Sequence, residues 1–165
     1  MKAVSNTTPL RYLIAIEQEH LLGQLFEKVF VPVAVHEELT DAKTPEVVRR
    51  RVLALPAWLE VRIVEETRAD VFPVTLHRGE REAILLAEAL QTDVLLIDEQ
   101  VGRNFALGRN LPLSGTLGVL ERADRIGLVG DFPEVLQKLK ACGFFISEPL
   151  EQQLVRRHRA RRGTE

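Results

Sequence analysis

The stretch TDVLLID, residues 92–98, ends an unbroken apolar run with an aspartate. An apolar run without alternating polar residues is typical of a strand that is buried on both faces of a parallel sheet. Asp98 is costly to bury at the end of such a strand unless it is paired or coordinated. The stretch therefore predicts a central strand with a candidate functional acid at its carboxyl end.

Strands and helices alternate on both sides of this run. Further strands are expected at 2–5, 28–32, 58–66 and 111–115, and the alternating apolar and charged residues of 58–66 are typical of an edge strand. Helices are expected to start at Thr8, His20, Val33, Thr44, Gly79, Gln100, Thr116, Asp131 and Ser147, with the threonines among them as N-caps. This order predicts an α/β fold, namely a three-layer α/β/α domain with a mainly parallel central sheet.

Length and composition limit the class of protein. The chain has 165 residues, enough for one domain of ordinary size. It contains no run of about 18 apolar residues to cross a membrane, and its N-terminus lacks the apolar core of a signal peptide. The single Cys142 can form neither an intramolecular disulfide nor a multi-cysteine zinc site. These features predict a cytoplasmic protein without membrane contact.

The charge is unevenly distributed along the chain. The last ten residues hold five arginines and one glutamate, a charge of +4, so the overall −2 leaves −6 for residues 1–155. The tail RRHRARR, residues 156–162, is expected either to bind phosphates or an acidic partner groove, or to be a solvated helix end. We therefore expect a domain at residues 1–150 and a C-terminal helix end with a basic tail at residues 151–165.

Four oxygen-bearing side chains follow strands or open helices. They are Asn6, Glu38, Glu80 and Asp98. Ligands of an α/β sheet lie beyond the carboxyl ends of the strands, and hard cations such as Mg²⁺ and Mn²⁺ prefer oxygen ligands. Each residue taken alone also has a structural alternative: Asn6 as a turn residue, Glu38 as a solvated surface acid and Glu80 as a helix-capping acid.

Five motifs together resemble the PIN domain. They are SNTTPL (5–10), VPVAVHEEL (31–39), GEREAILLA (79–87), LLIDEQVGR (95–103) and SGTLGVL (114–120). The resemblance covers about residues 2–150, and within the family it is to a prokaryotic subfamily whose first motif is SNTSPL-like. It implies an α/β/α fold, often dimeric, that binds magnesium or manganese and cleaves single-stranded RNA. The apolar helix HLLGQLF, 20–26, is a candidate dimer face.

The resemblance also implies a biological role and a set of catalytic residues. Many PIN proteins are toxin ribonucleases of toxin–antitoxin pairs and are inhibited by a small antitoxin protein. Asn6 stands at the position of the family's first aspartate, and Glu38, Glu80 and Asp98 match its other acids. Asn6 lacks the negative charge and Glu80 is one methylene longer than aspartate, so a module that only binds RNA or a protein partner is the alternative to a nuclease.

Five further residues are candidates near the same crevice. Glu99 is either an additional metal ligand that restores the charge missing at Asn6, or a helix-start acid. Arg103 is expected to contact a substrate phosphate or to pair with a neighbouring acid. Thr7 or Thr8 matches the hydroxyl residue after the first acid. Thr116 is expected to be a helix cap, and a hydroxyl placed near the crevice is the alternative.

Overall fold

The computed structural model describes residues 1–65 and 71–163. Its centre is a five-stranded sheet in the order β3-β2-β1-β4-β5, and every neighbouring pair of strands is parallel. The strands are β1 (Lys2–Ser5), β2 (Lys28–Pro32), β3 (Leu59–Arg62), β4 (Val94–Leu96) and β5 (Leu113–Ser114). The strand order reverses between β1 and β4, so a switch point, where ligands of such sheets bind, lies at their carboxyl ends.

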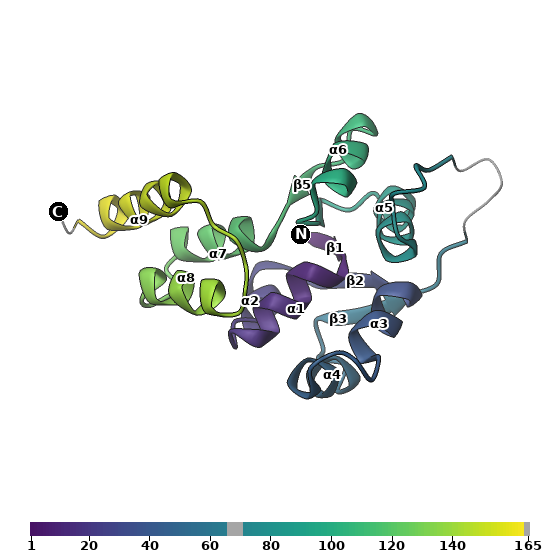
Figure 1. The fold of residues 1–165 in the computed structure, drawn as a ribbon, viewed down its shortest axis with the longest axis horizontal. Helices are drawn as coiled ribbons and strands as arrows, with labels where there is room; N and C mark the ends of the chain where they lie inside the picture. Colours follow the sequence, from purple (N-terminus) through teal and green to yellow (C-terminus); the bar gives the residue numbers. More distant parts are fainter. Residues whose placement is uncertain (66–70, 164–165) are drawn as a thin grey trace.

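Helices cover both faces of the sheet. They are α1 (Thr7–Ala15), α2 (His20–Leu25), α3 (Val33–Thr40), α4 (Glu46–Leu53), α5 (Arg78–Leu90), α6 (Gln100–Gly108), α7 (Thr116–Arg125), α8 (Phe132–Ala141) and α9 (Glu148–Arg162). Figure 1 shows α7, α8 and α9 gathered at one end of the molecule and α5 and α6 at the other, with α1 between them. No helix in the described residues is long and apolar enough to cross a membrane.

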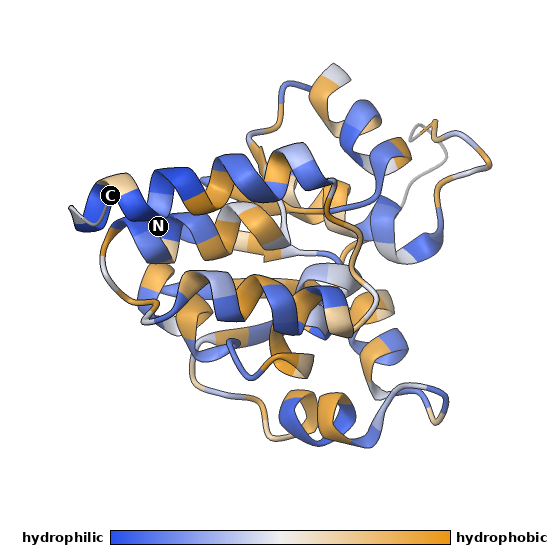
Figure 2. Ribbon diagram, turned by 60° about the vertical axis from the view of Figure 1, so that its left-hand side comes forward, coloured by the Kyte–Doolittle hydropathy of each residue, from blue (hydrophilic) through white to orange (hydrophobic). Residues whose placement is uncertain are grey.

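Two apolar clusters lie on opposite faces of the sheet and make it the middle layer. Ala3 belongs to the cluster packed by α1, α2, α7 and α8, whereas the next residue, Val4, belongs to the cluster packed by α5 and α6. Successive side chains of a strand point to opposite faces, so a strand covered on both sides must be apolar throughout. The helices carry hydrophobic and hydrophilic residues in alternating bands (Figure 2). The predicted three-layer α/β/α fold is confirmed.

The edge position predicted for the alternating strand is confirmed, but the strand is shorter than expected. β3 lies at the end of the sheet and covers residues 59–62. Its predicted last residue, 66, lies outside the described residues. The central strand β4 is likewise limited to Val94–Leu96, because Ile97 and Asp98 already lead into the turn before α6.

All three helices for which a threonine N-cap was predicted start differently. α1 begins at Thr7 with Asn6 as its N-cap, α4 begins after Pro45, and Thr116 is the first residue of α7 after Gly115. In each case a predicted capping threonine uses its hydroxyl elsewhere: Thr8 donates to Glu99, Thr44 to a backbone carbonyl and Thr116 to Asp98. Longer-range partners therefore replace local capping. Asp131, by contrast, caps α8 as predicted, through the amide of Glu134.

Helix α2 is part of the core. The sequence predicts a candidate dimer face on its apolar residues, but Leu21 and Leu22 are fully buried against the main cluster. Gly23 lies so close to the Trp58 ring that a Cβ at this position would lie 2.5 Å from Cδ1. Most of the apolar residues of α2 are therefore packed into the protein's own core.

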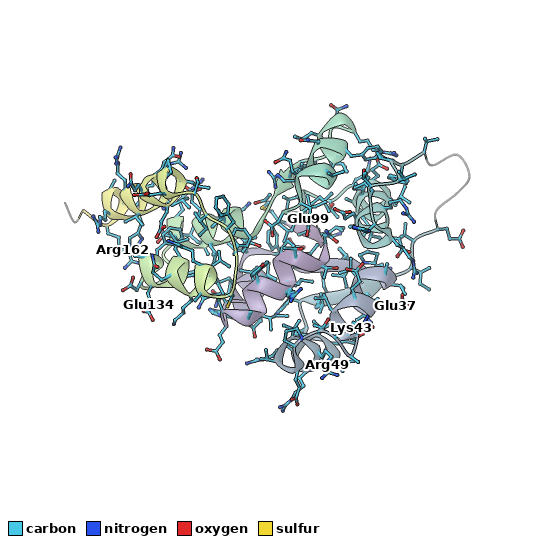
Figure 3. All side chains as sticks on the ribbon, in the orientation of Figure 1. Glu37, Lys43, Arg49, Glu99, Glu134 and Arg162 are labelled. Atoms are coloured by element: carbon cyan, nitrogen blue, oxygen red, sulfur yellow. The ribbon has the colours of Figure 1, made fainter. Side chains whose placement is uncertain are left out.

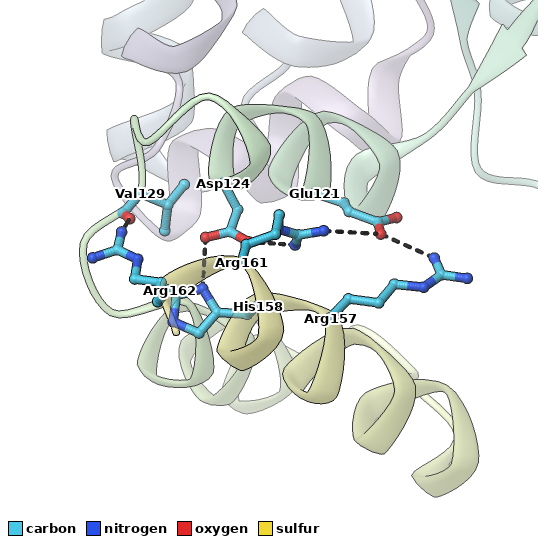
Figure 4. A network of polar contacts seen from close by, with 7 residues as sticks. All are labelled: Glu121, Asp124, Val129, Arg157, His158, Arg161 and Arg162. Atoms are coloured by element: carbon cyan, nitrogen blue, oxygen red, sulfur yellow. Dashed lines mark hydrogen bonds and ion pairs between the residues drawn. The ribbon is translucent and has the colours of Figure 1, made fainter. Parts of the chain in front are cut away.

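The basic tail is docked onto α7 instead of frayed. Asp124 accepts from Arg161 at 2.5 Å and contacts Nδ1 of His158 at 2.6 Å (Figure 4). Arg157 pairs with Glu121 at 2.9 Å. Residue 150, the predicted domain boundary, lies within α9, and residues 164–165 lie outside the described part of the chain. Much of the tail's positive charge is thus used inside the fold.

Candidate functional site

Asp98 is fixed at the carboxyl end of β4 by the start of α7. Its Oδ1 accepts from the Thr116 amide at 2.8 Å, and its Oδ2 accepts from the Thr116 hydroxyl at 2.6 Å. A Cβ at position 115 would lie 2.4 Å from Oδ1, so Gly115 is what allows the chain to pass this close. Both carboxylate oxygens are therefore held by one turn that follows β5.

Glu99 is held from the other side of the switch point. The side-chain amide of Asn6 donates to its Oε2 at 3.1 Å, and the Thr8 hydroxyl donates to its Oε1. Asn6 is 3% exposed, and its own backbone amide continues the sheet by donating to the Leu96 carbonyl at 2.9 Å. Figure 3 shows Glu99 in the middle of the molecule, above α1. The β1–α1 turn therefore fixes the acid that opens α6.

Glu38 on α3 contacts the β1–α1 turn, and Glu80 on α5 lies beside the start of α6. The Thr7 hydroxyl donates to Glu38 at 2.5 Å, and a Cβ at Gly79 would lie 2.6 Å from the other Glu38 oxygen. One Glu80 oxygen accepts from the His77 amide at 2.9 Å and so helps to cap α5. A Cβ at residue 102 would lie 3.1 Å from its second oxygen, which places Glu80 beside the first turn of α6.

Two of these acids have raised pKa values, and the charges of other acids in the set contribute to the rise. Burial is the main cause that raises the pKa of Glu80 above its ordinary value, and the charges of Glu99 and Glu38 add to the rise. Burial also raises the pKa of Asp98, assisted by Glu99 and opposed by the two hydrogen bonds from Thr116. A divalent cation would relieve such crowding of negative charge. We will call the four carboxylates of Glu38, Glu80, Asp98 and Glu99, with Asn6, the acid crevice.

Replacing Glu80 by glutamine is expected to raise the melting temperature of the protein at neutral pH without divalent cations. The raised pKa means that folding favours the protonated form. The stabilisation this gives is greatest below the ordinary carboxyl pKa and is lost as pH rises through the folded-state pKa. Glu80→Gln should therefore be more stable than the native protein above that range and lose the advantage in acid. Thermal unfolding in EDTA from pH 4 to pH 8 measures this, and equal melting curves at every pH would contradict it.

The oxygen donors suit a hard cation, but they are not gathered around one point. Among residues 1–65 and 71–163, no three acidic, histidine or cysteine side chains are arranged to hold a metal ion. The hydrogen bonds explain this, because each acid of the crevice is bound by a threonine hydroxyl, a backbone amide or Asn6. Carboxylate and amide oxygens remain the ligand type that Mg²⁺ and Mn²⁺ prefer. The chemistry of the donor set therefore fits such a cation.

Arg103 and Glu82 have structural roles that the sequence did not reveal. Arg103 donates to the carbonyls of Ile97 at 2.7 Å and Ser114 at 3.1 Å and thereby ties the end of β4 to that of β5. Its charge lies close enough to lower the pKa of Asp98 slightly, although burial prevails. Glu82 accepts from the Ala34 amide at 3.1 Å and from Arg78 at 2.7 Å, so it fixes the start of α3. Of the two acids in the first turns of α5, Glu80 is the one beside the crevice.

The glycines of the crevice were not singled out from the sequence. Gly79, Gly102 and Gly115 each lie where a Cβ would crowd a carboxylate of the crevice. The motifs GER, VGR and SGT place them next to the candidate site residues Glu80, Arg103 and Thr116, and this adjacency is the signal in the sequence. A groove of about 1300 Å³ runs along α9 and is lined by Lys140, Arg156 and Arg159, among others, but by no residue of the crevice.

The parallel sheet lies between layers of helices and has acids at its switch point, which defines an α/β/α domain with an acidic candidate site. A family model described as PIN domain matches residues 2–160, and the chain belongs to the PIN domain family. PIN domains are typically nucleases and generally depend on divalent metals. A PilT N-terminus domain protein from the hyperthermophilic archaeon Sulfolobus solfataricus has a similar fold, with a TM-score of 0.55 and 18% identity over 74% of this chain and 93% of that one. No curated protein matches the chain.

Proposed function

We propose that the protein is a metal-dependent ribonuclease that cleaves single-stranded RNA and belongs to a toxin–antitoxin type system. The observation that carries this proposal is the acid crevice. Its carboxylates come from α3, α5, the end of β4 and the start of α6, and burial together with the charge of Glu99 raises the pKa of both Glu80 and Asp98. Four acids brought together at a ligand-binding edge favour a catalytic centre over a set of capping residues.

Each residue of the crevice has a defined part in this proposal. Asp98, Glu38, Glu80 and Glu99 would hold Mg²⁺ or Mn²⁺ through their oxygens. When bound, such a cation activates water and stabilises the charge that develops during phosphodiester cleavage. Thr116 orients Asp98 through two hydrogen bonds, and the Thr7 hydroxyl orients Glu38. Arg103 keeps the ends of β4 and β5 in register, so its role in this proposal is to position Asp98, not to bind a phosphate.

A catalytically impaired PIN module that binds RNA or a protein partner is the second candidate. Two observations favour it: residue 6 is neutral, and the acids of the crevice are each occupied by a donor of the protein itself. In that case the crevice would bind without cleaving. An antitoxin-like partner and a homodimer are part of the proposal on the strength of the family resemblance.

Single-stranded RNA is expected to be cleaved with Mn²⁺ or Mg²⁺ and to remain intact in EDTA. The carboxylates alone cannot stabilise the charge of a phosphodiester transition state, because they are themselves negative. The measurement uses an end-labelled RNA without secondary structure, beside the same strand annealed to its complement. Activity should return when the cation is restored in excess over EDTA. Equal cleavage with and without EDTA would contradict metal dependence, and an intact RNA under all conditions would favour the binding module.

A further inference from the structure

Asn6 occupies the N-cap position of α1, but its side chain makes no capping hydrogen bond to that helix. Its amide nitrogen instead donates to Oε2 of Glu99, 93 residues away in the sequence. An ionised carboxylate only accepts hydrogen bonds, so the amide must present its nitrogen, and not its oxygen, to Glu99. A residue usually explained by local capping is thus committed to one acid of the crevice.

The charge of Glu99 affects two other acids of the crevice. Its charge raises the pKa of Glu80 on α5 and that of Asp98 at the end of β4. Both of its oxygens are held, one by Asn6 and the other by the Thr8 hydroxyl. The side chain is therefore fixed by two residues of the β1–α1 turn. A change in the position of Glu99 would change the electrostatic environment of both Glu80 and Asp98.

We propose, on the basis of the function proposed above, that Asn6 is a positioning residue that holds Glu99 in the crevice through its amide nitrogen. The negative charge on this side of the crevice is then carried by residue 99, and residue 6 contributes a donor and not a ligand. Asn6 is buried, so its amide has little access to water as an alternative partner. An aspartate at position 6 would set two carboxylates at hydrogen-bonding distance, where one of them must move away or become protonated.

The pairing is tested by exchanging the two groups. Asn6→Asp and Glu99→Gln are expected to weaken Mn²⁺ binding at pH 7 by at least about 10-fold, comparable to the loss of a partner that orients a metal ligand. Asn6→Asp should also lower the melting temperature measured in EDTA. The double variant Asn6→Asp/Glu99→Gln restores an amide–carboxylate pair with the charge on the other side. The double variant should recover most of the lost Mn²⁺ affinity and most of the lost melting temperature. The reason is that the amide introduced at position 99 then donates to the carboxylate introduced at position 6.

Two further measurements separate positioning from general folding effects. Thr8→Val removes the second donor to Glu99 without adding charge and should weaken Mn²⁺ binding with the fold intact by circular dichroism. The melting temperatures of the native, single and double variants in EDTA test the pair without metal or RNA. Recovery in the double variant, with no RNA cleavage by any of these proteins, would support the pair and overturn the proposed nuclease function.

Two results would overturn the inference itself. If the Asn6→Asp variant binds Mn²⁺ as tightly as the native protein, or more tightly, residue 6 is a ligand in its own right. A double variant that is no better than the two single variants, both in melting temperature and in Mn²⁺ affinity, would show that residues 6 and 99 act independently.

Discussion

Replacing Asp98 by asparagine is expected to reduce the rate of single-stranded RNA cleavage by more than about 100-fold. Removing even an outer partner of a metal ligand typically costs about 10- to 100-fold, and Asp98 is proposed as a ligand itself. The fold should survive the change. The asparagine side chain can still accept from the Thr116 amide and can donate to the Thr116 hydroxyl, so both contacts that fix Asp98 have a replacement. Single-turnover cleavage of the labelled RNA with Mn²⁺ measures the effect.

Asp93→Asn is the matched control for this variant. Asp93 is an exposed aspartate that precedes β4, at the end of the strand opposite to the crevice, and it accepts from the Lys2 amide at 2.6 Å. The control removes the same charge from the same segment of the chain, so it should leave the cleavage rate within about 2-fold of the native value. Equal rates for Asp98→Asn and Asp93→Asn would remove Asp98 from the catalytic centre.

Replacing Asp124 by alanine is expected to destabilise the protein by about 3 kcal/mol, which corresponds to a fall in melting temperature of roughly 6 to 12 °C. The side chain of Asp124 is 1% exposed and contacts both His158 and Arg161 of α9. Its loss leaves the charge of Arg161 without its nearest partner and removes the acceptor that faces the imidazole ring stacked on Phe132. Thermal unfolding at pH 7 gives the shift directly.

Glu134→Ala is the control for the stability measurement. Glu134 pairs with Lys138 on the exposed surface of α8, where both side chains are more than half exposed. Exposed pairs contribute about 0 to 1 kcal/mol, so this variant should shift the melting temperature by no more than roughly 4 °C. If Asp124→Ala lowered the melting temperature as little as the control does, the C-terminal helix would be held by its apolar contacts alone. The docked tail would then be available for another partner.

The architecture was readable from the sequence because it depends on short-range patterns. The apolar run before Asp98 predicted a buried parallel strand, and the alternating residues after Trp58 predicted an edge strand; both strands are found where expected, although shortened. The positions of the acids at strand ends and helix starts followed from the same patterns. These features need only the periodicity of each element and the general geometry of α/β sheets.

The partners of the acids were not readable, because they depend on contacts between distant segments. Thr7 reaches Glu38 across 31 residues, and Thr8 reaches Glu99 across 91 residues. In the sequence both threonines precede Pro9, and Thr8 looks like a capping residue. Their hydroxyls donate to carboxylates, because a charged acceptor forms a stronger hydrogen bond than a neutral carbonyl does. The same reasoning applies to the tail, whose arginines look free until the acids of α7 are placed beside them.

A calorimetric titration with Mn²⁺ tests most directly whether the acid crevice is a cation site. The native protein is expected to bind Mn²⁺ with a measurable heat, and the Asp98→Asn variant to bind it at least about 10-fold more weakly at the same pH. Because the titration needs no RNA, it does not depend on the substrate or on trace nucleases. Identical titration curves for the two proteins, or no binding by the native protein, would contradict the assignment of the acid crevice as a cation site.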